Sequence, residues 1–269
     1  MSFSTKNSNN ICRTIGERMD IMEPLLRVNE LEGGYTHKNV LHGISFEIFP
    51  NEIVALIGLN GAGKSTTIKH VIGLMHPKKG SVTIKGKSFN EAPETYRKQF
   101  GYIPEMPVLY DELTLEEHLR LTAMAYELTE EEYEIRVPPL LKEFRLENKL
   151  KWFPIHFSKG MRQKVMIMCA FLTEPNLYIV DEPFVGLDPL GIQSYLHWMN
   201  EMKENGAGVL MSTHILATAE RYCDRFVIIH EGVVRAHGTL DELRKTFHMP
   251  GATLDDIYVQ LTKEADAHA

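Results

Sequence analysis

The sequence predicts a mixed α/β fold with a mostly parallel sheet, an antiparallel β subdomain at its start and an inserted α-helical subdomain. Short apolar runs, such as those at 52–58 and 208–213, alternate with stretches of helical pattern. This alternation is typical of parallel sheets whose strands are buried on both faces. Between about 92 and 168 the sequence is instead helical and charged, which predicts the inserted subdomain.

The opening strands are predicted by period-two alternation and by glycine turns. Residues 25–31 read as a strand that ends at Gly33 and Gly34, and residues 40–49 alternate apolar and polar side chains. The run at 52–58 leads into a glycine-rich loop and then a helix, and residues 80–86 form a further short strand between glycines.

The middle and last parts continue the pattern. A helix is predicted from Thr114, because this threonine precedes the apolar pattern and Glu117 completes a capping box. Short apolar runs within 175–183, 208–213 and 224–232 then predict buried strands that alternate with helices. No internal repeat is evident, which indicates one catalytic unit in the chain.

The composition excludes several classes of protein. The chain has 269 residues, 43% hydrophobic content and a formal net charge of −7, and its basic residues are scattered. Binding to nucleic acid is therefore not expected. The three cysteines are far apart in sequence, which argues against structural zinc and disulfides and favours a reducing, intracellular setting. The longest apolar run, 165–172, is less than half of the roughly 20 residues that span a membrane.

Three segments are expected. Residues 1–23 are polar and predict a disordered or non-native extension; translation from Met19 or Met22 is an alternative, because the pattern begins at Leu25. Residues 24–240 form the catalytic domain, with its helical subdomain at about 92–168. Residues 241–269 form a helical tail, either flanking a dimer or simply packing on the surface.

The clearest motif is "GLNGAGKST" at 58–66, which matches a phosphate-binding loop between a strand and a helix. Its glycines let successive N–H groups point at phosphate oxygens, Lys64 reaches the β- and γ-phosphates, and Ser65 can ligate Mg²⁺. A chance glycine-rich turn is disfavoured by the flanking elements. The residues expected to bind nucleotide here are Gly58, Asn60, Gly61, Ala62, Gly63, Lys64, Ser65 and Thr66.

Acidic residues end a later strand. Asp181, after four apolar residues, suits a water-mediated Mg²⁺ contact, and Glu182 can act as the base or orient the attacking water. His214 follows another apolar strand. Because parallel strands deliver their carboxyl ends to one crevice, His214 is expected near the γ-phosphate.

These residues resemble the ATP-binding subunits of ABC transporters over roughly Leu25 to Leu240. In the family's terms, 58–66 is similar to the Walker A loop, the strand ending at Asp181 to Walker B, and "STH" at 212–214 to the switch histidine loop. "FSKGM" at 157–161 is similar to the family signature and "GLD" at 186–188, with Asp188, to the D-loop. Tyr35 stands where the family places an aromatic ring that stacks on adenine.

The resemblance implies that two copies pair head-to-tail. Each ATP would lie between the phosphate loop of one copy and the signature of the other, where Ser158 and Gly160 contact the γ-phosphate. The plainer interpretation, that Ser158 only caps its own helix, is compatible with this role. Lys159 and Met161 replace the family's usual Gly and Gln, whereas Ser158 and Gly160 are retained.

Glu105 also departs from the family, which commonly has a glutamine there. A carboxylate beside Asp181, Glu182 and three phosphates adds like-charge repulsion unless Mg²⁺ shares it. Our hypothesis is that Glu105 takes the Mg²⁺-sensing role with a steeper metal dependence. The alternative is a solvent-facing loop acid.

Three longer stretches, 101–128, 151–172 and 211–226, resemble the Ecs-type (EcsA) ATPases of Gram-positive bacteria. This resemblance implies an exporter powered by ATP and Mg²⁺ at the cytoplasmic face of the plasma membrane, with an EcsB-like integral membrane permease subunit. The apolar residues within 104–110 would dock that subunit or pack locally. A soluble ABC-type ATPase acting on the ribosome or DNA is the alternative, and a P-loop kinase or GTPase is disfavoured because no NKxD sequence occurs.

Overall fold

The structure, a computed structural model, describes residues 23–35 and 38–267. Apart from Glu23, the predicted N-terminal extension lies outside the described residues, and so do the alternative starts Met19 and Met22.

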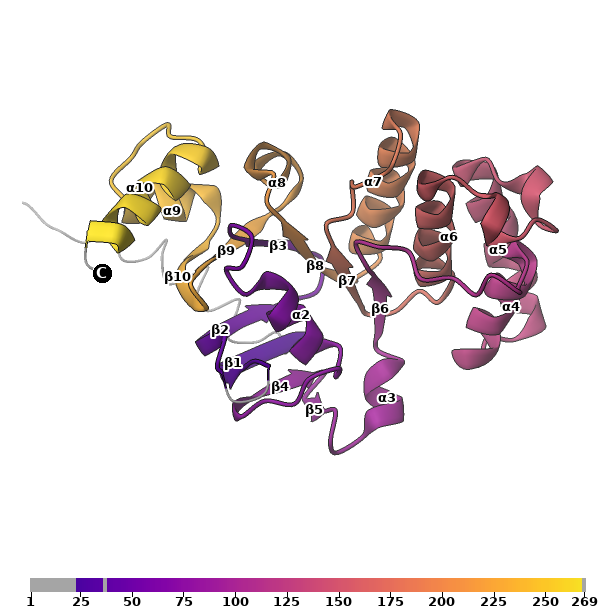
Figure 1. Cartoon of the computed structure of the whole chain (residues 1–269), viewed down its shortest axis with the longest axis horizontal. Helices are drawn as coiled ribbons and strands as arrows, with labels where there is room; N and C mark the ends of the chain where they lie inside the picture. Colours follow the sequence, from indigo (N-terminus) through magenta and orange to yellow (C-terminus); the bar gives the residue numbers. More distant parts are fainter. Residues whose placement is uncertain (1–22, 36–37, 268–269) are drawn as a thin grey trace, which may run out of the picture.

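Within these ranges the larger sheet has six strands in the order β10-β9-β3-β8-β7-β6 (Figure 1). Neighbouring strands from β9 to β6 are parallel, and β10 is antiparallel to β9. Every residue of β3 and β7 is buried, as the continuous apolar runs predict. The strand bounds are β3 Ile53–Ile57, β6 Phe100–Ile103, β7 Leu177–Asp181, β8 Gly208–Thr213, β9 Arg225–His230 and β10 Val233–Gly238.

The smaller sheet is antiparallel and has the order β2-β1-β4-β5 among the described residues. Its strands are β1 Leu26–Gly33, β2 Leu41–Ile48, β4 Lys79–Ile84 and β5 Lys87–Ser88. One hydrophobic core joins this sheet to the parallel sheet and to Ile68 and Val71 of helix α2, Lys64–Val71. The predicted fold class, a P-loop core with an antiparallel β subdomain and a helical subdomain, is confirmed.

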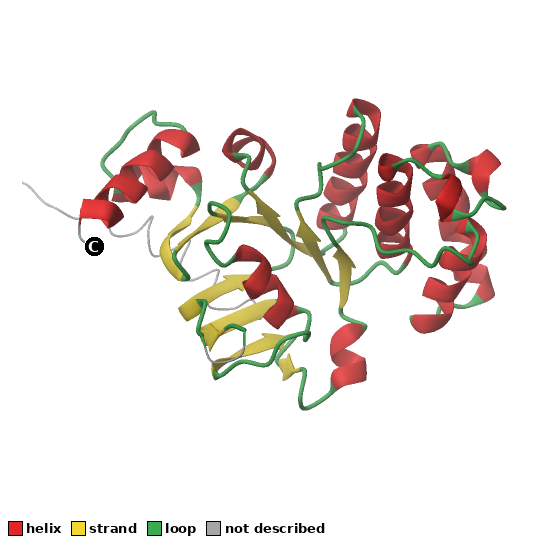
Figure 2. Ribbon diagram, in the orientation of Figure 1, coloured by secondary structure: helices red, strands yellow, loops and turns green. Residues whose placement is uncertain are grey.

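The helical subdomain lies at one end of the molecule (Figure 2). It contains α4 Leu115–Ala125, α5 Glu130–Phe144, the short 3-10 turns η1 Glu147–Lys149 and η2 Pro154–His156, and α6 Lys159–Leu172. Helix α6 packs against α4, α5 and α7, Pro189–Glu204, and shares a second core with the parallel sheet. The predicted capping box of Thr114 and Glu117 is present at the start of α4.

The predicted limits of this subdomain differ from the structure. The range 92–168 includes helix α3, Pro93–Arg97, and also β6, which is the edge strand of the parallel sheet. Four residues with a glycine among them are too short to show a strand period, so β6 is not separable from its helical surroundings in the sequence. Helix α6 also continues four residues beyond 168, to Leu172.

The C-terminal segment packs on the body of the molecule. Helices α8 Leu216–Tyr222, α9 Leu240–Thr246 and α10 Leu254–Ala267 form a third core with residues of β3 and β9 (Figure 1). Leu243, Leu254 and Ile257 are almost fully buried there. Among the described residues, no helix combines the length and the apolar character that crossing a membrane requires.

Candidate functional site

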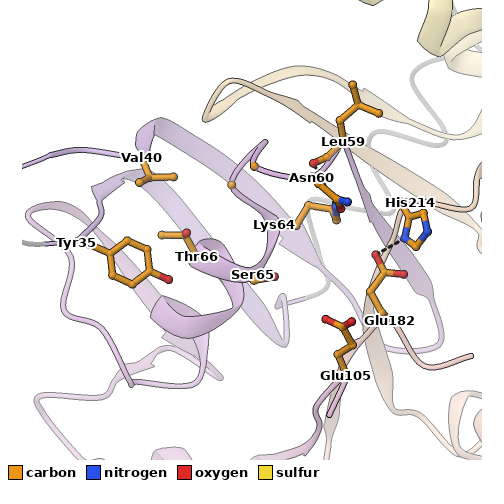
Figure 3. A pocket seen from close by; sticks show the side chains of 12 residues that line it. Tyr35, Val40, Leu59, Asn60, Lys64, Ser65, Thr66, Glu105, Glu182 and His214 are labelled. Carbon is orange, nitrogen blue, oxygen red and sulfur yellow. Dashed lines mark hydrogen bonds and ion pairs between the residues drawn. The ribbon is translucent and has the colours of Figure 1, made fainter. Parts of the chain in front are cut away.

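An open cleft of about 430 Å³ lies at the carboxyl edge of the parallel sheet (Figure 3). This edge collects the ends of β3, β7 and β8, because Ile57 pairs with Thr213 and Asp181 pairs with Ser212. Most of the predicted site residues line the cleft: Tyr35, Asn60, Gly61, Gly63, Lys64, Ser65, Thr66, Glu105, Glu182 and His214. Parallel strands have therefore brought residues together that are far apart in the chain.

The loop between β3 and α2 is shaped for an anion. Gly63 precedes α2 with φ 116°, a left-handed conformation that side chains rarely adopt, and a Cβ there would lie 2.9 Å from Leu41 Cδ2. The first turn of α2 carries no acidic side chain. The loop N–H groups and the positive end of the helix dipole can therefore receive phosphate oxygens.

Lys64 is buried against its own loop. Its Nζ donates to the backbone oxygens of Gly58 at 2.7 Å and Leu59 at 3.3 Å. Burial lowers the pKa of the Lys64 ammonium group, and the neighbouring carboxylates of Glu182 and Asp181, then that of Glu105, oppose this shift. The ammonium group thus lies near three carboxylates. A bound phosphate can replace the loop carbonyl oxygens as its hydrogen-bond acceptor.

Two acids end strand β7. Asp181 is buried and accepts a hydrogen bond from the Ser212 hydroxyl of β8. Glu182 follows with φ 48°, an uncommon backbone conformation for a non-glycine residue, and its N–H donates to the Ser212 carbonyl oxygen at 3.2 Å. Its carboxylate oxygen Oε1 lies 2.9 Å from Nδ1 of His214 (Figure 3). His214 can therefore fix the orientation of a carboxylate that faces the cleft.

Glu105 lines the same cleft on the loop after β6. Nearby, burial raises the pKa of Tyr102 to about 12, with smaller contributions from the charges of Asp181 and Glu105. The preceding residue, Pro104, accepts a hydrogen bond through its carbonyl oxygen from Gln163 Nε2 of helix α6 at 3.1 Å. This bond ties the Glu105 loop to the helical subdomain.

Tyr35 lies at the end of the cleft opposite Glu182 and His214 (Figure 3). Its ring is half exposed, and its hydroxyl accepts a hydrogen bond from Lys69 Nζ at 2.8 Å. This bond is the main cause of the lowered pKa of Tyr35. An exposed ring fixed at its hydroxyl can stack on a planar base.

The donors predicted for a metal are hard oxygen ligands that suit Mg²⁺. Ser65 supplies a hydroxyl, and Asp181 and Glu105 supply carboxylates. Among the residues that the structure describes, no group of three or more His, Cys, Asp or Glu side chains is arranged to hold a metal. Mg²⁺ usually takes only a few ligand oxygens from the protein, and phosphate oxygens and water complete its coordination.

Ser158, Gly160 and Asp188 do not line the cleft of their own chain. The Ser158 hydroxyl accepts from the Met161 N–H at 3.3 Å and caps α6. A Cβ at Gly160 would lie 2.6 Å from the carbonyl oxygen of Gly186, so a side chain does not fit between the two segments. Asp188 caps α7 through the Gly191 N–H, and its hydrogen bond with Lys164 lowers its pKa.

Some residues that shape the site are not evident from the sequence. Val40 and Leu59 line the cleft, and the Ser212 hydroxyl bonds both the Asp181 carboxylate and the backbone N–H of Glu182. Ser212 sits at the end of a predicted strand, so its place near the acids could have been anticipated. The contact of Leu59 with Tyr258 of α10 could not be anticipated, because no sequence pattern near either residue predicts it.

Known proteins are similar to this chain in sequence and in fold. A sequence model described as "ABC transporter" matches residues 41–185. The ABC-type transporter ATP-binding protein EcsA of Bacillus subtilis (strain 168) is 68% identical over 244 residues, which cover 91% of this chain and 99% of that protein. The SkfA peptide export ATP-binding protein SkfE of the same organism is 36% identical over 208 residues, covering 77% of this chain and 86% of that protein.

A solved structure described as the ATP-binding subunit of an ABC transporter superposes with a TM-score of 0.87 at 66% identity, covering 88% of this chain and 99% of the other. The proteins matched are transporter subunits, and they give no support to the alternative of an ATPase acting on the ribosome or DNA. With this extent of similarity in sequence and in fold, the chain belongs to the family of ABC transporter ATP-binding subunits, which are ATPases.

Proposed function

We propose that this chain binds and hydrolyses Mg-ATP between two copies of itself and so drives an Ecs-type exporter. The observation that carries the proposal is the division of the site. The phosphate loop, Glu182 and His214 share one cleft, whereas Ser158 and Gly160 stand outside it. A second copy, placed head-to-tail, supplies the missing half.

Within one copy, the loop N–H groups and Lys64 bind the phosphates, and Tyr35 receives the adenine. Ser65, Asp181 and Glu105 hold the metal. When bound there, Mg²⁺ supplies neutralisation of the phosphate charge. Lys64 gives up its bonds to the carbonyl oxygens of its loop in favour of the phosphate.

Hydrolysis depends on Glu182. Its carboxylate orients the attacking water and accepts its proton, while His214 holds the carboxylate at 2.9 Å and faces the γ-phosphate. The Ser158 hydroxyl and the Gly160 N–H of the second copy close the site and exclude bulk water. Asp188 lies on the segment after Gly186 that contacts the signature, and it serves at the interface between copies.

The membrane partner docks beside the site. Met106, Val108 and Tyr110 are exposed, whereas Leu109 between them packs against the core that the helical subdomain shares with the parallel sheet. This segment can therefore pack locally through Leu109 and still offer its exposed side chains to the membrane subunit. Trp152, Phe153 and Ile155 are further exposed apolar side chains.

Arg162 joins these two apolar segments. Its Nη1 bonds Asp111 Oδ1 and the Pro154 carbonyl oxygen, each at 3.4 Å. We call Met106, Val108, Tyr110, Trp152, Phe153 and Ile155 the docking surface. Exposed apolar patches of this kind are typical of protein interfaces. An EcsB-like permease at the cytoplasmic face of the plasma membrane is the proposed occupant.

The proposed direction of transport is export. The relative SkfE is named for peptide export, and EcsA supplies the Ecs-type assignment. No nucleic-acid partner is proposed, because the net charge of −7 gives no basic surface to attract one.

The test uses Glu182→Gln in the full chain. Without the carboxylate, ATPase activity is expected to fall by about a hundredfold or more, in the range of a lost general base. ATP then persists, and light scattering with saturating Mg-ATP is expected to give twice the monomer mass. Glu204→Gln, an exposed acid far from the cleft, is the matched control and should hydrolyse ATP like the parent.

A Glu182→Gln protein that stays monomeric in Mg-ATP, both alone and with its membrane partner, would contradict the head-to-tail arrangement. Retained ATPase activity would contradict the role of Glu182.

A further inference from the structure

Helix α10 contacts the phosphate loop although it lies at the other end of the sequence. The Tyr258 hydroxyl accepts a hydrogen bond from the backbone N–H of Leu59 at 3.1 Å. Tyr258 is only 7% exposed and belongs to the core formed by α8, α9, α10 and the β3–β9 pair. Its ring is therefore held by packing, and its hydroxyl is a fixed acceptor.

The backbone of Leu59 forms several hydrogen bonds within the loop. Its carbonyl oxygen accepts from Lys64 Nζ at 3.3 Å and from the Ala62 N–H at 3.1 Å. The peptide units on either side of Leu59 thus link the Tyr258 hydroxyl to the ammonium group that is to meet the phosphates. A shift of Leu59 would displace the carbonyl that holds Lys64.

The loop is also held from its other side. The Ala62 carbonyl oxygen accepts from the N–H of Gly232, in the turn between β9 and β10, at 2.9 Å. Tyr258 and Gly232 together fix two points of a loop that includes Gly61 and Gly63, both with positive φ. Glycine-rich segments lose much conformational freedom when they are ordered, so fixed points reduce the cost of ordering the loop around a ligand.

The same helix is tied to the segment that carries the switch histidine. Glu220 of α8 accepts the Leu254 N–H, at the start of α10, at 2.7 Å. Helix α8 begins at Leu216, two residues after His214. Helix α10 therefore contacts the loop that binds phosphate and the helix that follows the histidine facing it.

We propose that Tyr258 is a positioning residue for ATP binding: its hydroxyl anchors Leu59 and thereby presets the phosphate loop and Lys64. Helix α10 is then part of the nucleotide site and not only a packing element. This inference rests on the proposed function, because it assumes that ATP occupies the loop. It concerns only how the loop is held in position before ATP binds.

The test is Tyr258→Phe in the full chain, which removes one oxygen and keeps the ring. Calorimetric titration with Mg-ATP is expected to show a Kd about two- to tenfold higher than the parent, the range that a net hydrogen bond supports. In ATPase assays the KM should rise by the same factor while kcat stays within about twofold, because Glu182 and His214 are untouched.

Tyr195→Phe is the matched control. Tyr195 of helix α7 is fully buried in the core that α6 and α7 share with the parallel sheet, and its hydroxyl has no hydrogen-bond partner among the described residues. This variant should bind ATP like the parent. Both variants are compared well below their thermal midpoints, so that only folded protein is titrated.

An unchanged Kd for Tyr258→Phe overturns the inference, whether or not the variant is less stable, because the hydroxyl would then be merely structural. An equal loss of affinity in Tyr195→Phe overturns it as well. Neither result touches the proposed function, which is tested separately by ATP binding to the parent and by the Glu182→Gln protein.

Discussion

Glu105 adds a carboxylate to the cleft in which we propose that ATP binds. Its charge acts on Lys64 together with those of Glu182 and Asp181. Without a metal these charges repel the phosphates, and with Mg²⁺ a carboxylate is a stronger ligand than an amide. We therefore expect Glu105 to make nucleotide binding depend more strongly on Mg²⁺ than a glutamine at this position would.

Glu105→Gln tests this. In EDTA the variant is expected to bind ATP about three- to tenfold more tightly than the parent, because one nearby like charge is worth roughly a pKa unit of interaction. Its ATPase activity should rise less steeply with Mg²⁺ concentration. Glu112→Gln, on the same loop and exposed, carries the equal charge change and should match the parent. Identical Mg²⁺ titrations for Glu105→Gln and the parent would leave Glu105 as a solvent-facing acid.

At the scale of single elements, helix α5 depends on its cap. Pro138 and Pro139 lie inside it, and each removes a backbone donor. At its start the Glu132 carboxylate accepts from the Thr129 N–H at 2.8 Å and from the Thr129 hydroxyl at 2.9 Å. The backbone bond, followed by the hydroxyl bond, lowers the pKa of Glu132.

Because folding lowers the pKa of Glu132, its ionised carboxylate stabilises the folded protein. This stabilisation is complete above the pKa of the unfolded state, about 4.3, and is lost as the pH falls through the pKa of the folded state. Glu132→Gln is therefore expected to lower the urea midpoint at pH 7 and to have no effect near pH 3. Glu131→Gln removes an equal charge from the same helical turn without the capping bonds. The loss for Glu132→Gln should exceed that for Glu131→Gln at pH 7; equal losses at every pH would mean that only the helix dipole is involved.

Elements with a strong local pattern are those that the sequence predicts. The buried strands β3 and β7 follow from continuous apolar runs, and the sides of the cleft follow because parallel strands end together. In contrast, β6 has four residues and β10 is mostly half-exposed, so neither shows a clear period. The contact of Tyr258 with Leu59 could not be predicted, because it joins residues 199 positions apart and a tyrosine on an apolar helix face indicates only packing.

At the scale of the whole molecule, helix α6 connects the parts that transport must couple. Its first turn carries Ser158 as the cap, Gln163 holds the Glu105 loop, and Arg162 joins the two segments of the docking surface. Movement of a membrane partner on that surface would therefore act on both halves of the ATP site through one helix.

A hydrogen bond to the buried His118 fixes one end of the docking surface. The Tyr110 N–H donates to His118 Nε2 at 3.0 Å, so Nδ1 carries the proton and donates to the Thr114 carbonyl oxygen at 2.8 Å. The buried imidazole thus fixes the backbone at Tyr110 while Val108 remains 76% exposed. A hydrogen-bonded backbone with exposed apolar side chains is suited to an interface, because little ordering is needed on binding.

Val108→Asp is expected to reduce co-purification of the membrane partner from detergent by about tenfold or more, because an unpaired carboxylate would be buried at an apolar contact. Leu74→Asp is the matched control: Leu74 is 70% exposed, follows α2 and is not part of the docking surface. Both proteins should still form the ATP-dependent dimer on the Glu182→Gln background, since neither position lines the cleft. If Val108→Asp retains the partner as well as Leu74→Asp does, the permease binds elsewhere, and the exposed apolar side chains need another explanation.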